Sequence, residues 1–131
     1  MSIESRLYTQ LTTHSGLTAL IAKRATQVQL PQTPTLPAVT YLRVSTVPVV
    51  TRSDGAPPYS QARFQIDGWA TTFDGMIALR KQIRAAMGAW RVTTTGQRVD
   101  VALLSGDRDV LEAEPNRWRC TLDYMVHHQE D

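Results

Sequence analysis

Cysteine is nearly absent from this 131-residue sequence: Cys120 is the single one, so the chain cannot form a disulfide within itself. A run of roughly 20 apolar residues, the length that a membrane-spanning helix needs, is also absent. The segment Met1–Arg6 has polar residues throughout and lacks the unbroken apolar stretch of a signal peptide. We therefore expect a soluble protein that is made in the cytoplasm, where thiols stay reduced.

The motifs of catalysis are missing as well. The sequence contains no nucleophile elbow, phosphate-binding loop, dinucleotide-binding glycine pattern or helical pair of zinc-binding histidines. His127 and Cys120 point to opposite faces of one predicted strand, and His128 would lie about 26 Å from Cys120 along it. Cys120 stands between Trp118 and Leu122 on an apolar face, which is typical of a core residue. We predict no catalytic residue, cofactor or metal ion, and hence no enzyme.

Neither positive nor negative charge is in large excess. The net charge is +2, and Lys23 and Lys81 are the only lysines among the 14 basic residues. The densest basic cluster, Arg80, Lys81 and Arg84, shares one predicted helix, which is less than a non-specific nucleic-acid groove requires. Arginine suits protein interfaces too, because its guanidinium group pairs with carboxylates in a fixed geometry. The codon bias of a G+C-rich genome explains the arginine excess equally well.

Three segments carry apolar residues at helical spacing: about 3–11, 17–21 and 73–88. Ser2 is a suitable N-cap for the first of them. The longest segment places four apolar residues on one stripe, which predicts the side that it buries: Met76, Leu79, Ile83 and Met87.

Alternation of apolar and polar residues predicts strands over about 38–47, 61–71, 99–103 and 118–126, with a weaker one over 26–30. In the clearest of them, four small or apolar residues fall on one face: Phe64, Ile66, Gly68 and Ala70. The last strand has a similar face: Trp118, Cys120, Leu122, Tyr124 and Val126.

Three polar segments are expected to lie outside these elements. Segment 48–60 contains the turn signal Asp54-Gly55 and has little to bury, which predicts an exposed, mobile loop. The alternative is a hairpin that turns at these two residues and has two long arms. Asp107–Pro115 is acidic and turn-like, and we expect the polar tail 127–131 to fray.

These elements predict a single α+β domain over residues 1–131. It contains one mostly antiparallel sheet of about four to five strands, with two N-terminal helices and one longer helix packed on one face.

The other face of the 61–71 strand is polar and carries Arg63, Asp67 and Trp69. An exposed tryptophan beside an arginine can stack on nucleic-acid bases. The alternative is that a helix or a neighbouring subunit covers this face. The lack of a basic groove favours the second interpretation.

Five sequence blocks occur in the order typical of one family. The most specific is Arg63–Ala70 (RFQIDGWA), followed by the helix at Ala78-Leu79, and the others are Ser2–Leu11, Gly16–Ile21, Leu36–Tyr41 and Trp118–His127. With these blocks the chain resembles the tail completion proteins of long-tailed bacteriophages and prophages, which act as tail terminators or head-to-tail joining proteins. Gly68 departs from the family pattern, where a cysteine or another small residue is common, and the loop around Asp54 is of uncertain length.

The resemblance implies a structural protein that forms a ring, six-fold in this family, at the end of the tail tube. There the ring stops tube polymerisation and offers its other face to the head. The implied partners are further copies of the chain, the tail tube protein and the head completion or connector protein, with no membrane and no specific nucleic acid. The implied location is the virion tail, assembled in the cytoplasm of a bacterial host.

For such an assembly protein we predict an interface drawn from the 48–60 segment and the polar strand face: Arg52, Ser53, Asp54, Tyr59, Arg63 and Trp69. A segment that orders only when a partner docks meets its entropy cost at that moment. The alternative to a phage protein is a non-viral module that binds a protein or a nucleic acid.

Overall fold

The computed structural model describes residues 2–32, 34–49, 59–92, 98–112 and 117–129, which form three helices and five strands. The helices are α1 (Ile3–Thr13), α2 (Ser15–Ile21) and α3 (Phe73–Gly88). The strands are β1 (Ala25–Gln27), β2 (Ala38–Val49), β3 (Tyr59–Ala70), β4 (Val99–Glu112) and β5 (Arg117–Gln129).

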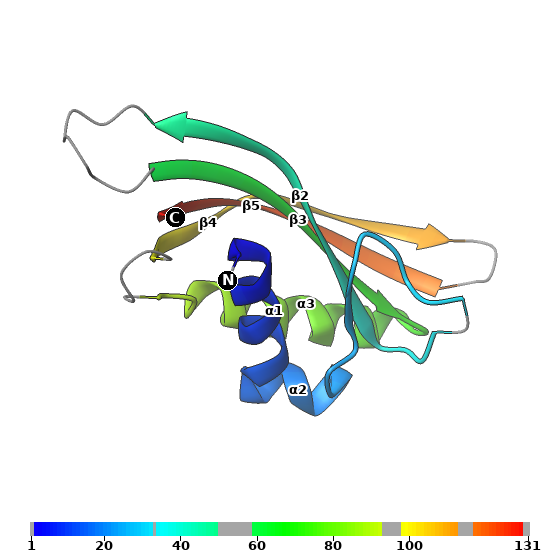
Figure 1. Ribbon diagram of the computed structural model, residues 1–131. Helices are drawn as coiled ribbons and strands as arrows, with labels where there is room; N and C mark the ends of the chain where they lie inside the picture. Colours follow the sequence, from blue (N-terminus) through cyan, green and yellow to red (C-terminus); the bar gives the residue numbers. More distant parts are fainter. Residues whose placement is uncertain (1, 33, 50–58, 93–97, 113–116, 130–131) are drawn as a thin grey trace.

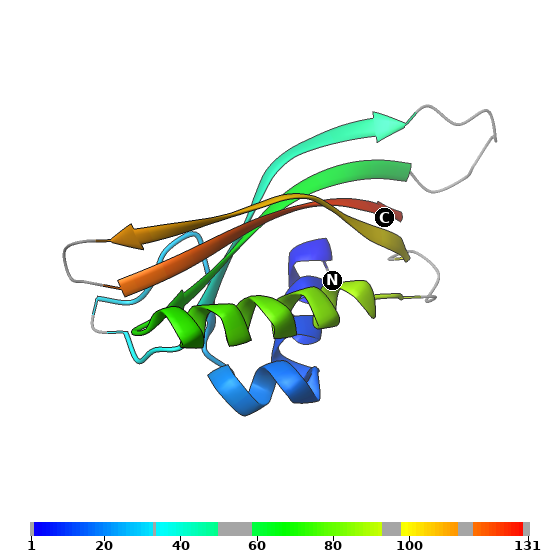
Figure 2. The same cartoon turned by 180° about the vertical axis from the view of Figure 1, so that it is seen from behind.

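All five strands belong to one sheet, in the order β1-β2-β3-β5-β4. Strands β2, β3, β5 and β4 pair antiparallel, while the short β1 runs parallel to β2. In Figure 1 the four long strands form a twisted layer with the three helices on one side of it, and Figure 2 shows the same arrangement from behind. The predicted α+β class, with a mostly antiparallel sheet and helices on one face, is confirmed.

Local sequence signals set the beginnings of the first and last helices. The Ser2 hydroxyl accepts a hydrogen bond from the Ser5 N–H at 3.1 Å, as expected for the N-cap of α1. Thr72 plays the same part for α3 by accepting from the Gly75 N–H at 3.0 Å. Both helices therefore begin at a side chain that satisfies a backbone donor left without an intrahelical partner.

The hydrophobic core lies between the helices and the side of the sheet that faces them. Strand β3 contributes Phe64 and Ile66, strand β5 contributes Leu122, and α3 contributes Leu79 and Ile83, all of them fully buried. The strand faces predicted from alternation are therefore confirmed, as is the buried stripe of the longest helix.

Gly68 lies where side chains of α3 and β5 pack tightly against the backbone of β3. A Cβ atom there would lie 2.8 Å from Leu79 Cδ2, 2.9 Å from Cys120 Sγ and 3.0 Å from Ile83 Cδ1. Such contacts are too short for real side chains, so α3 and β5 fill the space that a larger residue would need. This close approach explains a glycine at the position where the sequence departs from the family pattern.

The segment 48–60 is not a loop throughout, because strands occupy both of its ends. Pro48 pairs with Ser60, and Val49 pairs with Tyr59; residues 50–58 lie outside the described part of the chain. Proline is compatible with this position because β2 is the edge of the sheet there, where a missing N–H interrupts no ladder. The described portion agrees with the alternative that we considered, a hairpin with long arms.

The expectation of a frayed tail over 127–131 is wrong for residues 127–129. Strand β5 continues to Gln129, which pairs with Tyr59 and donates its N–H to the Arg98 carbonyl at 2.7 Å. His128 is fully buried. Backbone pairing with β3 on one side and β4 on the other keeps residues 127–129 in the sheet, although their polar composition suggested fraying. Residues 130–131 lie outside the described ranges.

The acidic segment 107–115 is likewise not a turn over its first half. Asp107 to Glu112 belong to β4 and pair with β5, while residues 113–116 fall outside the described ranges. Charged side chains are well tolerated here because β4 is an edge strand, and Asp109 forms an ion pair with Arg80 of α3.

The packing predicts a sharp difference between core and surface truncations. Phe64→Ala and Leu122→Ala should each lower the free energy of unfolding by about 2–5 kcal/mol, because each leaves a cavity in the core. Leu111→Ala is the matched control, since Leu111 is 47% exposed and its truncation should change stability by no more than about 0.5 kcal/mol. Urea denaturation followed by circular dichroism measures all three, and equal midpoints would show that the strand faces are wrong.

Candidate assembly interface

The outer edge of β2 is open over most of its length. Strand β1 covers only Val39 to Tyr41, and within the described residues no strand pairs with the outer edge beyond that point. Leu42, Val44 and Val47 on this stretch are 40%, 43% and 57% exposed. A long unpaired edge that carries apolar side chains is a ready template for another strand.

Strand β4 forms the opposite edge of the same sheet. Among the described residues, its outer side pairs only at Val99, through an isolated bridge to Val92. Four exposed apolar side chains follow along the strand: Val101, Leu103, Leu104 and Leu111. Each copy of the molecule therefore has two long open strands, one at each end of the sheet.

Both open strands contain irregularities in register, one in β2 and two in β4, where the first lies between Val99 and Val101. In β2 the register with β3 shifts between Arg43 and Ser45, so Val44 is the extra residue. In β4 the register with β5 shifts between Leu104 and Gly106, so Ser105 is extra there. Such bulges bend a strand locally and are common at sheet edges.

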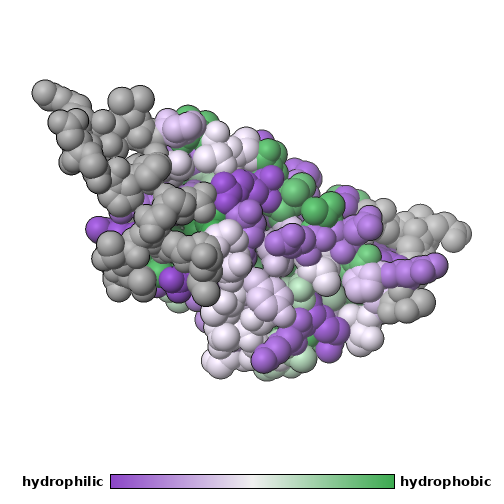
Figure 3. Space-filling model, viewed as in Figure 1, coloured by the Kyte–Doolittle hydropathy of each residue, from purple (hydrophilic) through white to green (hydrophobic). Residues whose placement is uncertain are grey.

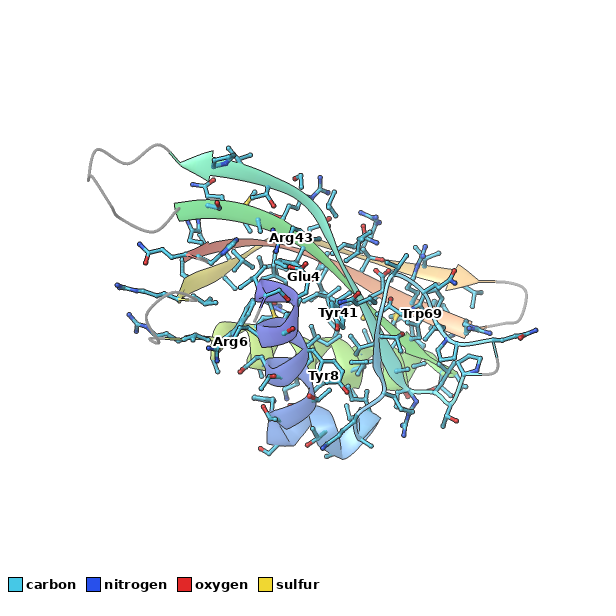
Figure 4. The ribbon with its side chains drawn as sticks, viewed as in Figure 1. Glu4, Arg6, Tyr8, Tyr41, Arg43 and Trp69 are labelled. Carbon is cyan, nitrogen blue, oxygen red and sulfur yellow. The ribbon has the colours of Figure 1, made fainter. Side chains whose placement is uncertain are left out.

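Arg43 anchors the base of the open stretch of β2. Its guanidinium group forms an ion pair with Glu4 of α1, lies 5.8 Å from the Phe64 ring centroid and donates to the Thr46 hydroxyl at 3.2 Å. Figure 4 shows Arg43 close to Glu4, at the N-terminal end of α1. The helix layer thereby fixes the direction in which β2 leaves the body of the molecule.

On the face away from the helices, Trp69 is enclosed by groups of its own chain. Its indole N–H donates to the Thr40 hydroxyl at 3.1 Å. The guanidinium groups of Arg117 and Arg119 lie 5.9 and 5.2 Å from the ring centroid. Cation–π contact uses the ring face that base stacking would need, so the stacking alternative considered for Trp69 gains no support.

Arg63 lies on the same face in a small charge network. The Oδ2 atom of the buried Asp123 carboxylate lies 3.4 Å from the Arg63 guanidinium group and 3.8 Å from that of Arg108, with both arginines substantially exposed. Figure 3, in the view of Figure 1, shows small apolar patches separated by polar groups on the side of the molecule where α1 is seen. On the face away from the helices, the buried Thr121 hydroxyl and the Oδ1 atom of Asp123 have no hydrogen-bond partner among the described residues of the isolated chain.

The predicted interface residues fall into separate groups. Arg63 and Trp69 share the face opposite the helices, as alternation predicted, and Tyr59 pairs with Val49 and Gln129 within the sheet. Arg52, Ser53 and Asp54 lie outside the described residues. The predicted interface includes no residue of the open edges, although Val44 and Val47 give the second half of β2 an unusually apolar sequence.

The structure offers little for chemistry. Cys120 is fully buried, and burial raises the pKa of its thiol, which disfavours the nucleophilic thiolate. Within the described residues, no group of three or more histidine, cysteine, aspartate or glutamate side chains is placed to hold a metal ion. None of the helices there is long and apolar enough to cross a membrane.

The basic cluster of α3 borders a shallow hollow of about 420 Å³ lined by Ile77, Arg80, Lys81, Arg84 and Ala85. Arg80 is paired with Asp109 of β4. A hollow with one of its three cations already neutralised gives little support to a nucleic-acid groove.

The described part of the chain is an α+β domain with two open strand edges and a buried thiol. The sequence model of the family described as "Tail completion protein gp17" matches residues 5–129. The chain therefore belongs to the tail completion protein gp17 family and is a structural tail protein.

Comparison with solved structures supports the fold independently. A chain of the structure described as "Virion of native gene transfer agent (GTA) particle" is similar, with a TM-score of 0.77 over 98% of this chain and 95% of that chain. The two sequences are 17% identical, so the likeness concerns the fold alone. No curated protein sequence matches the chain.

The burial of Cys120 predicts an unreactive thiol. In the native protein a thiol reagent such as dithiobis-nitrobenzoate should react slowly at pH 7, and raising the pH to 9 should accelerate it little because the pKa is raised. Unfolding in urea should expose the thiol and restore the ordinary rate. Absorbance at 412 nm follows the reaction, and fast labelling of the native state would contradict the assignment of Cys120 to the core.

Proposed function

We propose that copies of this chain form a closed ring at the end of the tail tube, where the ring stops tube polymerisation and provides the surface that joins the tail to the head. The resemblance to tail terminators implies six copies. The partners are then the tail tube protein on one side and the head completion or connector protein on the other. Assembly takes place in the cytoplasm of the bacterial host.

The observation that carries this proposal is the pair of open edges at opposite ends of one sheet. The β2 edge of one copy and the β4 edge of another are different surfaces, so a contact between them is heterologous. Heterologous contacts repeat from copy to copy and close into a ring when the rotation per copy allows. Backbone pairing at an edge is also a known mode of protein recognition.

Two further observations support a place within a phage-like particle. The family is named for tail completion, and the similar solved structure is described as part of a gene transfer agent virion. In this proposal the tip of the β2–β3 hairpin, with Arg52, Ser53 and Asp54, contacts a neighbouring component. Tyr59, Arg63 and Trp69 then lie along the hairpin and the sheet face that approach it.

The first test is the oligomeric state and the location of the protein. Light scattering on a sizing column over a wide concentration range should give a discrete hexamer. A protein that stays monomeric in solution should instead label the tips of purified tail tubes, because termination then uses the tube as a template. A protein that neither forms a ring nor binds tube tips would overturn the proposal.

Shortening the hairpin provides a second test. Deletion of Ser53–Pro58 leaves residues 50–52 to connect the two strands, a length that hairpins accommodate. The variant should unfold at the same urea concentration as the unaltered protein because the core is unchanged. Phage carrying it should make tails of abnormal length that fail to join heads, as seen by negative-stain electron microscopy. Tails of normal length would refute a role for the hairpin tip in termination.

A further inference from the structure

We propose that the open stretch of β2 before Pro48, Leu42–Val47, pairs antiparallel with the first half of β4 in the next copy, in a register that sets Val47 beside Leu103. This inference specifies the junction of the proposed ring and rests on that proposal. It commits to one occupant for both edges, a second copy of this chain.

The direction of the strands follows from the topology. The strands β2, β3, β5 and β4 alternate in direction, so β2 and β4 of one copy run opposite to each other. Rotation about a ring axis that lies roughly along the strands keeps these directions in every copy. The β2 strand of one copy then meets the β4 strand of the next in antiparallel orientation, which continues the alternation of the sheet.

The register follows from the two bulges. An antiparallel ladder that crosses a bulge in each strand regains its pairing only where the bulges lie side by side. With Arg43 opposite Asp107, the two bulges lie side by side, Val44–Ser45 facing Ser105–Gly106, and Val47 falls opposite Leu103 on the other side of them. The second irregularity of β4, between Val99 and Val101, lies next to the bridge with Val92 that already occupies the outer edge there. A slip of one residue would turn side chains to the wrong face of the sheet.

The side chains that meet in this register fit one another. Cross-strand partners share a face, so Val47 and Leu103 both lie on the face away from the helices, through Gln61 and Met125 respectively. They are 57% and 52% exposed in the isolated chain, and pairing would cover both.

Opposite charges meet on the other face of the same junction. Arg43 lies on the helix-facing side, through its pairing with Phe64, and Asp107 lies there through Leu122. Asp107 is exposed. The junction therefore brings Arg43, which already pairs with Glu4, beside a second carboxylate, and opposite charges on facing strands favour their pairing.

The backbone also favours Val47 and Leu103 as a cross-linking pair. The Val39 N–H and the Tyr41 carbonyl point away from β3, toward the β1 side. Both residues have their side chains on the helix-facing side of the sheet. The backbone N–H and C=O groups of β2 that point to the open edge therefore belong to residues on that side. Val47 lies on the other side, which makes its contact with Leu103 a non-hydrogen-bonded pair with Cα atoms about 4.5 Å apart. That distance suits a disulfide.

The test is oxidative cross-linking of the variant Val47→Cys/Leu103→Cys, in free protein and in purified tails. Within one copy the two positions are separated by β3 and β5, roughly 14 Å apart, so only a bond between copies can form. We expect a ladder of covalent multimers on a non-reducing gel that ends at the ring size. Mixing the two single variants should give covalent dimers by the same bond.

Three controls define the register. Val47→Cys alone and Leu103→Cys alone should each run as a monomer on the non-reducing gel. Val47→Cys/Arg108→Cys should also give no cross-linked species, because Arg108 shares the face of Leu103 but lies four pairs away along β4. Rings that remain intact by light scattering while Val47→Cys/Leu103→Cys stays uncross-linked would overturn the junction and leave the ring standing. Cross-linking of Val47→Cys to itself would indicate a twofold β2–β2 contact and would also overturn it. Absence of any oligomer, in solution and at tail tips, would instead remove the ring itself.

Discussion

The unbroken pairing of β3 with β5 is the constraint on which the rest of the molecule depends. It runs from Tyr59↔Gln129 to Ala70↔Trp118 without a register shift, and it fixes which side of each strand faces the helices. A slip of one residue would turn Phe64 and Leu122 out of the core, because side chains alternate between faces. The irregularities between long strands all occur where β2 and β4 join this central pair. The centre of the sheet thus keeps the register that the core needs, while the flanking strands are free to bend.

This arrangement leaves the outer edges of β2 and β4 open in the isolated chain. A free chain with two long unpaired strands is exposed to indiscriminate pairing and aggregation. Pro48, which lacks an N–H, and the bulges at Val44 and Ser105 interrupt a regular ladder on both edges. The same features select a partner whose irregularity lies at the matching position. Devices that protect the isolated chain therefore also give the proposed junction its specificity.

Sequence reasoning predicted most of the fold because local patterns and tertiary packing agree over most of the chain. The buried faces were predicted correctly from two patterns. These are the apolar stripe from Met76 to Met87 and the alternation over 61–71 and 118–126. Reasoning failed where a distant partner overrides local composition. His128 is buried because strand pairing extends past the end that its polar neighbours suggested, and Asp109 sits in a strand where Arg80 of α3 neutralises it.

The candidate interface was the least predictable part, because exposure depends on neighbours that a single sequence does not reveal. Arg63 and Trp69 were chosen as polar or exposed, yet Asp123 and Thr40 already satisfy them within one copy. The edges of β2 and β4 instead have unmet backbone pairing capacity, which no side-chain motif records. An assembly surface made of backbone groups depends on strand length, direction and bulge position more than on residue identity. The TM-score of 0.77 at 17% sequence identity shows that this fold is kept while most side chains differ.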